Sequence, residues 1–206
     1  MKFGLIATGR IAETQLAPAI IAAAGAELWS VYSRDKQRAD DFAARHGAAS
    51  ETPGYDDLDA MLADQELDAV LIASPDKLHA PQTIAAARAG KHVLTEKPMT
   101  TDRASAAAMV SACADANVKL GVAYHLRWHA GHRALHANAQ AGALGTLRHM
   151  RVQWPMQSGP ENWRAQEELA TWWCLSGVGT HCLDQIRWFM GPTQGEVVRL
   201  LPLITK

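Results

Sequence analysis

The chain has 206 residues, 48% hydrophobic and 20% charged, so it can bury a core and is not a disordered polypeptide. Its formal net charge of -1 supplies no long-range field for binding nucleic acid or an anionic membrane. The three cysteines form no C-x-x-C pair, and no apolar run reaches the ~18 residues that a membrane-spanning helix needs. Without an export signal, we expect a cytoplasmic protein that binds neither nucleic acid nor membranes.

Short apolar segments alternate with helix-forming segments along the first 120 residues. The predicted strands, rich in Val, Ile and Leu, span residues 2–7, 27–33, 68–74, 91–95 and 118–123. The predicted helices span residues 11–24, 36–45, 55–63, 80–89 and 102–116. This alternation predicts an α/β fold, a doubly wound parallel sheet of the Rossmann type with helices on both faces. Pro18 should kink or shorten the first helix.

The composition changes near residue 125, because six of the seven tryptophans lie beyond it. We therefore predict a nucleotide-binding domain over residues 1–123 and a partial C-terminal domain over residues 124–206. The second domain should contain helices over residues 128–141 and 181–190 and strands over residues 147–156 and 197–204. These elements would make a partial α+β domain with an open sheet.

The turn after the first predicted strand is where a sheet of this kind contacts a dinucleotide. In the G-x-G-x-x-G/A pattern, the middle glycine lets backbone N–H groups approach a pyrophosphate, and the last small residue allows close helix packing. Gly9 and Ala12 occupy these positions, whereas Ala7 replaces the first glycine. The incomplete pattern alone also fits an ordinary strand-to-helix turn. Its place at the start of the fold favours a cofactor site formed by Ala7, Thr8, Gly9, Arg10 and Ile11.

The end of the second predicted strand indicates which nicotinamide cofactor is preferred. NAD sites usually carry an acidic residue there, which binds the ribose 2′-hydroxyl. This chain has Ser33 and Arg34, whose hydroxyl and guanidinium groups suit a 2′-phosphate. Because the neighbouring Asp35 could serve NAD, NADP is the preferred cofactor and NAD the alternative.

The fourth and fifth predicted strands end in polar motifs. Open α/β sheets bind ligands outside the carboxyl ends of their strands, so residues at these ends should face the cofactor and substrate. The residues concerned are Ser74, Pro75, His79, Glu96 and Lys97. In a partly desolvated site beside a positive nicotinamide ring, the neutral amine of Lys97 would be favoured and could accept a proton. A lysine considered alone would more often be a solvated loop residue.

Taken together, these motifs resemble the glucose-fructose oxidoreductase and inositol dehydrogenase (Gfo/Idh/MocA) family. The resemblance rests on residues 4–12, on Ser74-Pro75 with His79, on His181 with Asp184, and most specifically on AGKHVLTEKP at residues 89–98. It implies an NAD(P)-dependent oxidoreductase that transfers a hydride between nicotinamide and a hydroxyl or carbonyl carbon of a sugar, polyol or related cyclic alcohol. It also implies a C-terminal open sheet that often mediates homo-oligomers.

The same resemblance implies roles for individual residues. Lys97 and His181 would be the catalytic residues. The substrate pocket would be lined by Lys97, Tyr124, His125, Arg127, Trp163 and His181.

Two departures from the family pattern matter for activity. Gly177 stands four residues before His181, where the family commonly has an aspartate. The chain ends at Lys206, whereas the resemblance implies well over a hundred further residues, so we expect a fragment or a truncated reading frame. Such a chain should either self-associate through its exposed sheet or be the ordered part of a longer polypeptide, with weak or no activity as it stands. These departures support an alternative, a non-catalytic nucleotide-binding or scaffold relative.

A histidine cluster offers a third hypothesis, a metal-dependent hydrolase. His125, His129, His132 and His136 recur at helical spacing, which would place several imidazoles near one another. No cysteine or nearby carboxylate joins them, and zinc sites usually draw ligands from more than one element. A polar helix face is the favoured interpretation, and we predict no metal site. Trp172-Trp173 could flank a sugar, although core or interface packing is the more common role for such residues.

Overall fold

The computed structural model describes residues 1–155 and 175–195. Its six strands form one parallel sheet in the order β3-β2-β1-β4-β5-β6. The strands are β1 (Lys2–Ile6), β2 (Glu27–Tyr32), β3 (Gly54–Tyr55), β4 (Ala69–Ile72), β5 (His92–Thr95) and β6 (Leu120–Val122). This order is that of a doubly wound dinucleotide-binding sheet, which confirms the predicted Rossmann fold.

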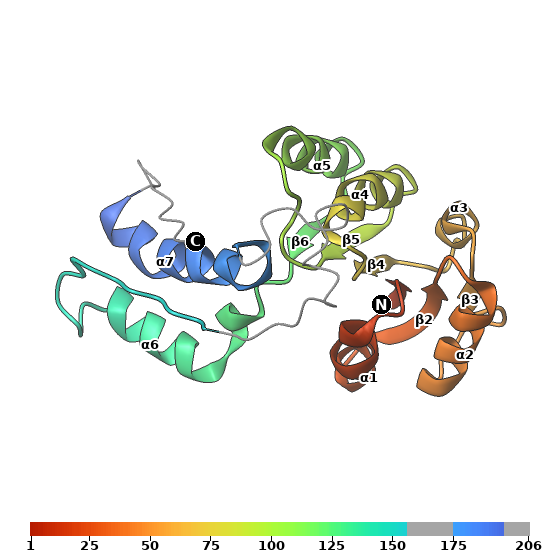
Figure 1. The fold of residues 1–206 in the computed structure, drawn as a ribbon, viewed down its shortest axis with the longest axis horizontal. Coiled ribbons are helices and arrows are strands. Elements are labelled where there is room, and N and C mark those ends of the chain that lie inside the picture. The colour runs from red at the N-terminus through yellow and green to blue at the C-terminus, as the bar shows by residue number, and fades with distance from the viewer. Residues whose placement is uncertain (156–174, 196–206) are drawn as a thin grey trace.

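The helices cover both faces of the sheet, with α1 and α2 on one face and α3, α4 and α5 on the other (Figure 1). They are α1 (Ala17–Ala22), α2 (Lys36–His46), α3 (Leu58–Leu62), α4 (His79–Arg88), α5 (Arg103–Asp115), α6 (Ala130–Gln140) and α7 (Thr180–Gln194). Shorter turns are η1 (Ala12–Leu16), η2 (Asp76–Leu78), η3 (His125–Trp128) and η5 (Leu175–Gly179). No helix within the described ranges is both long and apolar enough to cross a membrane.

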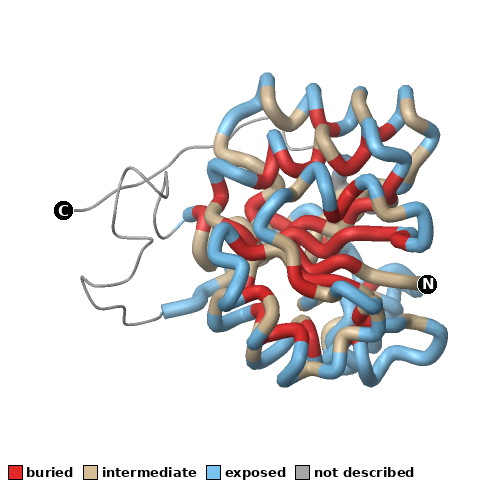
Figure 2. The backbone as a smooth tube through the Cα atoms, turned by 90° about the vertical axis from the view of Figure 1, so that its right-hand side faces the viewer, coloured by how far each residue is buried: buried red, intermediate tan, exposed pale blue. Residues whose placement is uncertain are grey.

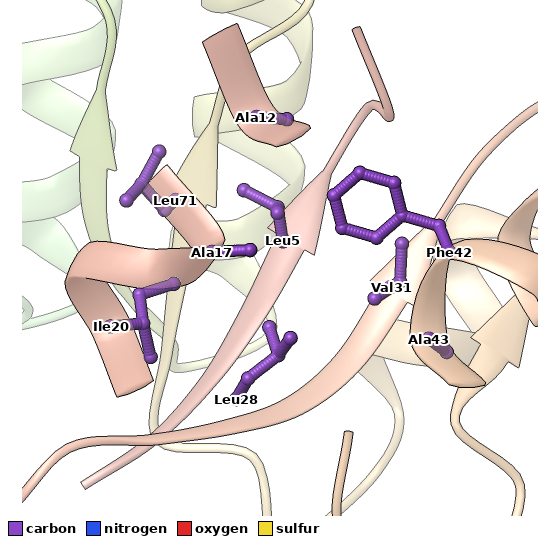
Figure 3. Close-up of a cluster of buried hydrophobic side chains, with 9 residues drawn as sticks. All are labelled: Leu5, Ala12, Ala17, Ile20, Leu28, Val31, Phe42, Ala43 and Leu71. Carbon is purple, nitrogen blue, oxygen red and sulfur yellow. The ribbon is translucent and has the colours of Figure 1, made fainter. Parts of the chain in front are cut away.

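Consecutive strand residues pack on opposite faces of the sheet because the side chains of a strand alternate. Leu5 lies in the cluster with Ile20 of α1 and Phe42 of α2, whose side chains point toward one another (Figure 3). The next residue, Ile6, packs on the other face with Met61 of α3. Figure 2 shows the buried residues concentrated in the strands and on the inner faces of the helices. This two-sided burial explains why the strands are continuous apolar runs.

The helix after β1 is irregular at the position where proline was expected to disturb it. η1 is a π-helical turn in which the N–H of Ala17 bonds to the carbonyl of Ala12, five residues back. Pro18 follows directly, and it has no N–H to donate to the preceding turn. The helix is therefore widened directly before Pro18, and α1 continues to Ala22.

β3 replaces the start of the helix predicted over residues 55–63. Gly54 approaches α2 so closely that a Cβ at this position would collide with the side chain of Asp40 and with its backbone nitrogen. The helix then begins at Leu58, because the side chain of Asp57 accepts hydrogen bonds from the N–H groups of Asp59 and Ala60. A two-residue strand carries too little periodicity to be predicted.

The strand predicted over residues 147–156 is not found in its described part, because residues 147–155 form no regular element. A strand needs a neighbour to pair with, and all the strands of the described residues belong to the sheet formed by residues 2–122. The strand predicted over residues 197–204 lies outside the described residues.

Lys91, the lysine inside the AGKHVLTEKP run, has a structural role. Its side chain is 6% exposed, and Nζ donates to the carbonyl of Asp64 at 2.6 Å and to that of Leu67 at 2.9 Å. These carbonyls lie in the connection between α3 and β4. The lysine therefore provides hydrogen bonds to backbone carbonyls of a segment that is distant in the sequence.

We expect Lys91→Met to lower the free energy of unfolding by about 2 kcal/mol, because one buried and one partly buried carbonyl lose a charged donor. Urea denaturation would measure the change. Lys119→Met is the matched control, since the exposed Lys119 side chain makes no hydrogen bond within the described residues, and we expect it to be neutral. Equal stability of the two variants would contradict the structural role of Lys91.

Candidate active site

The turn after β1 has the conformation that a dinucleotide-binding fingerprint needs. Ala7 has a φ of +84°, in the left-handed region that glycine adopts without strain, and its N–H donates to the carbonyl of Tyr32 at 2.9 Å. Ala7 therefore adopts the strained turn that the first glycine of the pattern supplies elsewhere. The alanine changes the residue at this position and leaves the geometry of the turn intact.

Gly9 faces open space at the start of the following helix. A Cβ placed on Gly9 would meet no atom within 4 Å, and the Gly9 carbonyl already accepts from the N–H of Glu13 at 3.0 Å. Thr8 is buried, whereas Arg10 and Ile11 are exposed beside the turn. The helix N-terminus thus presents free N–H groups to a space in which a phosphate can approach the backbone.

Two arginines follow β2 near this turn, Arg34 in the connection to α2 and Arg38 in the first turn of α2. Arg34 is exposed and makes no hydrogen bond or ion pair within the described residues. Arg38, which sequence reasoning missed, donates from Nη2 to the carbonyl of Thr8 at 3.3 Å. Ser33 is buried, and the carboxylate of Asp35 caps α2 by accepting from the N–H of Arg38 at 3.1 Å. The signal in the sequence was the position of Arg38 in the first turn of the helix that follows Arg34.

His79 connects the carboxyl ends of two neighbouring strands. Its ring is 1% exposed, with Nδ1 2.8 Å from the carbonyl oxygen of Pro98 and Nε2 2.8 Å from that of Ser74. The Ser74 hydroxyl donates to Oε1 of Gln82 at 2.6 Å, and Pro75 is half-buried at the start of η2. Both nitrogens of His79 therefore face backbone oxygens, which leaves neither of them for a polar contact with a cofactor.

Lys97 reaches across the site from the end of β5. Its Nζ donates to the carbonyl of Gly177 at 2.7 Å, and its backbone N–H donates to the Glu96 carboxylate at 3.2 Å. The Lys97–Pro98 peptide is cis. Gly177 is the position at which the resemblance described above implies an aspartate. Here the backbone carbonyl of this position contacts the amine.

His181, in the first turn of α7, lies in an aromatic enclosure. The ring is 3% exposed, and ring-centroid distances are 4.6 Å to His125, 5.5 Å to Trp154 and 6.1 Å to Tyr124. Nδ1 of His181 is buried without a hydrogen-bond partner within the described residues. Burial, and then the positive charges of Lys97 and His125, lower the pKa of His181 to about 4. The imidazole is therefore neutral near neutral pH.

The remaining predicted pocket residues have different positions. Arg127 binds the Asp184 carboxylate through Nε and Nη2, at 2.6 to 3.1 Å, so its charge is paired with that of a buried carboxylate. Trp163 lies outside the described residues. Gln185, which sequence reasoning missed, is 4% exposed, and its Nε2 has no partner among the residues described. It lies one helical turn after His181, on the same face of α7.

The four clustered histidines separate into different environments. His129 and His132 have ring centroids 4.8 Å apart, whereas His136 stacks on Trp188 at 4.2 Å and His125 lies beside His181. Within residues 1–155 and 175–195, no three histidine, cysteine or acidic side chains lie close enough together to hold a metal ion. The four histidines lie along the segment from η3 to α6, but their side chains do not come together at one point.

Comparison with known proteins places both parts of the chain. Residues 1–124 match the model of the Gfo/Idh/MocA oxidoreductase family, described as an NAD-binding Rossmann fold, and residues 132–200 match the Gfo/Idh/MocA C-terminal domain. The 1,5-anhydro-D-fructose reductase of Ensifer adhaerens is 32% identical over 201 residues, which are 97% of this chain and 59% of that protein.

Two solved structures are also similar. The aldose-aldose oxidoreductase from Caulobacter crescentus, complexed with glycerol, has a TM-score of 0.83 at 27% identity, covering 93% of this chain and 58% of that one. KijD10, a 3-ketoreductase from Actinomadura kijaniata in complex with NADP, has a TM-score of 0.63 at 33% identity, covering 72% of this chain and 46% of that one. This chain thus spans about half to three-fifths of the length of these relatives. Together with the parallel sheet, these matches show that the chain belongs to the Gfo/Idh/MocA family of oxidoreductases.

Proposed function

We propose that this chain carries the cofactor domain and the reacting centre of an NADP-dependent oxidoreductase that acts on a sugar or polyol. The observation that carries the proposal is the position of Lys97 and the neutral His181 at the carboxyl end of the Rossmann sheet. The relatives named above include a sugar reductase and an aldose oxidoreductase, which supports this substrate class. In this proposal, residues 1–123 bind the cofactor and residues from 124 onward contribute to the substrate side.

The residues around the first turn fit a dinucleotide phosphate. The turn from Ala7 to Ile11 would hold the pyrophosphate through backbone N–H groups, into the open space beside Gly9. Arg34 and Arg38, with the Ser33 hydroxyl, would bind a 2′-phosphate through charge-assisted hydrogen bonds. The bound nicotinamide would supply the hydride chemistry, and the protein would orient its ring toward the substrate carbon.

Lys97 and His181 would divide the handling of the proton. Nζ of Lys97 would exchange a proton with the reacting oxygen of the substrate, and the neutral His181 imidazole would form a hydrogen bond to the same oxygen. The Gly177 carbonyl orients the amine without adding the negative charge that a carboxylate would bring. Enclosure by Tyr124, His125 and Trp154 keeps water away from this position.

The experiment that tests the proposal combines binding with turnover. NADPH and NADH would be titrated by fluorescence, and NADP-linked oxidation or reduction would be followed with a panel of aldoses, ketoses and polyols. We expect NADPH binding and turnover of at least one sugar or polyol. Tight NADPH binding without turnover of any of them would favour the non-catalytic alternative, which the glycine at position 177 already supports.

We expect Arg34→Ala and Arg38→Ala each to weaken NADPH binding about tenfold or more, because each removes a charge-assisted hydrogen bond to the 2′-phosphate. NADH lacks this phosphate, so its affinity should change much less. The dissociation constants would be measured by fluorescence titration. The control is Arg103→Ala, at an exposed position in α5. Equal losses for both cofactors would remove the assignment of these arginines.

Homo-oligomer formation is a further part of the proposal. Trp128, at the end of η3, is 76% exposed. Leu135 in α6 and Leu144 after α6 are also exposed. Large apolar side chains at the surface favour association with a second copy. Trp172 and Trp173, for which the sequence allows either a sugar contact or core or interface packing, lie outside the described residues.

A further inference from the structure

The segment that leaves the Rossmann sheet is attached to α7 at two points. After β6, the side chain of Tyr124 forms a 3.0 Å hydrogen bond between its Oη and Oγ1 of Thr180. Three residues later, Arg127 forms the bidentate ion pair with Asp184, in which Nη2 lies 2.6 Å from Oδ1. Residues 124–127 therefore contact α7 near its start and again one turn further along.

These two attachments lie on either side of His181 in the sequence. Thr180 precedes His181 directly, and Asp184 follows it by three residues, which places Asp184 on the same side of the helix. A slip of one residue would rotate α7 by about 100° and would break both attachments. The two contacts therefore fix the rotation of α7 about its own axis, and with it the direction of the His181 side chain.

The ion pair is suited to fix a direction. Asp184 is 8% exposed, so it would be costly to leave its carboxylate without a partner. The guanidinium fork allows only a narrow range of relative orientations, unlike a point charge. Arg127 is in turn held near Trp188, with Cζ 5.9 Å from the ring centroid. Figure 1 shows α7 beside α6, with the connection from β6 reaching its first turn.

We propose that Arg127, Asp184 and Tyr124 are positioning residues, which hold the His181 imidazole beside Lys97 by attaching α7 to the segment that follows the cofactor sheet. Tyr124 and Arg127 thereby act on the reaction through His181, in place of the direct substrate contacts that the sequence suggested. The functional importance of this arrangement rests on the proposed function, whereas the positioning itself can be tested without substrate or cofactor.

The test follows the His181 imidazole by long-range proton–nitrogen NMR over a pH series on the whole chain. The ring is identified by its disappearance in His181→Gln. The titratable and aromatic groups facing it are Lys97, His125, Tyr124 and Trp154. The variants are Arg127→Ala, Arg127→Lys, Asp184→Asn and Tyr124→Phe. Arg133→Ala is the matched control. Arg133 is on α6, where its guanidinium lies over the ring of Trp128, and it makes no hydrogen bond or ion pair with α7 within the described residues.

In the wild type, His181 should remain neutral until the pH approaches about 4. Arg127→Ala and Asp184→Asn should raise its titration midpoint by about one pH unit or more, because a released helix hydrates the ring. Arg127→Lys keeps the positive charge and lacks the two-pronged guanidinium. Relative to Arg127→Ala it should restore thermal stability, while the titration midpoint of His181 stays above that of the wild type. Tyr124→Phe removes one hydrogen bond without loss of packing and should shift the midpoint in the same direction by less.

An unchanged His181 midpoint in Arg127→Lys and Tyr124→Phe, each folded as judged by its amide spectrum, would overturn the proposal and leave the ion pair a purely structural contact. A shift in the Arg133→Ala control would also overturn it. If turnover is found, the positioning variants should lower kcat while leaving the KM for NADPH unchanged. A protein without turnover could still show the NMR effect, so the two proposals fail separately.

Discussion

Lys97→Met is expected to lower turnover by about 10²-fold or more, because general acid–base groups typically contribute 10²- to 10⁴-fold. Methionine is close to lysine in length and lacks the Nζ that donates to the Gly177 carbonyl. The cofactor phosphates would be held by the turn after β1, and NADPH affinity should therefore remain nearly unchanged. Steady-state turnover with the best substrate of the panel and fluorescence titration of NADPH would measure the two quantities.

The control for this variant is Lys119→Met, at the opposite, amino-terminal end of β6, which should retain full turnover. If Lys97→Met remains active, the proton is handled elsewhere, most directly by His181. His181→Ala should then be the severe variant. A loss of NADPH binding in Lys97→Met would show instead that the amine contributes to the cofactor site.

Acid should destabilise the protein through His181. The ordinary pKa of the group is 6.5, and burial lowers it to about 4 in the folded state. Below about pH 6.5 the unfolded chain binds a proton that the folded protein does not, so stability falls as the pH falls. The stability that depends on the neutral ring is complete above pH 6.5 and is lost down to about pH 4. The loss should be about 3 kcal/mol over this window.

Urea denaturation at several pH values would measure this effect as the difference between the wild type and His181→Gln. Carboxylates titrate in the same range in both proteins, and their contribution cancels in the difference. His149→Gln, at an exposed position, should retain the pH dependence of the wild type. Parallel stability profiles for the wild type and His181→Gln would show that the ring is accessible to protons in the folded protein.

Local patterns in the sequence were enough to predict the Rossmann half of the molecule. Strands that are buried on both faces are mostly apolar along their length, and Val70, Leu71 and Ile72 of β4 show this directly. Helix ends could also be predicted from the sequence. Asp102 caps α5, where its carboxylate accepts from the N–H of Ser105 at 2.8 Å, and Gly47 ends α2 with a φ of +64°. These signals act over a few residues and need no tertiary context.

The roles of the motif residues depended on contacts between distant segments. Within AGKHVLTEKP, Lys91 satisfies carbonyls between α3 and β4, whereas Lys97 reaches Gly177, 80 residues further along. His79 and Arg127 resembled ligand-binding residues, yet the fold occupies His79 with backbone oxygens and Arg127 with Asp184. The sequence alone places such polar residues near a sheet end without specifying their partners.

Sequence patterns were sufficient to predict the Rossmann fold, and they also pointed to the turn after β1 and to Lys97 and His181 as candidate site residues. Only the tertiary structure decided that His181 is neutral, because its pKa depends on burial and on the nearby charges of Lys97 and His125. It also decided that Arg38 joins Arg34 beside the turn and that Arg127 pairs with Asp184. Hydrogen bonds and desolvation act over a few ångströms in space, whereas Lys97 and His181 are 84 residues apart in the chain.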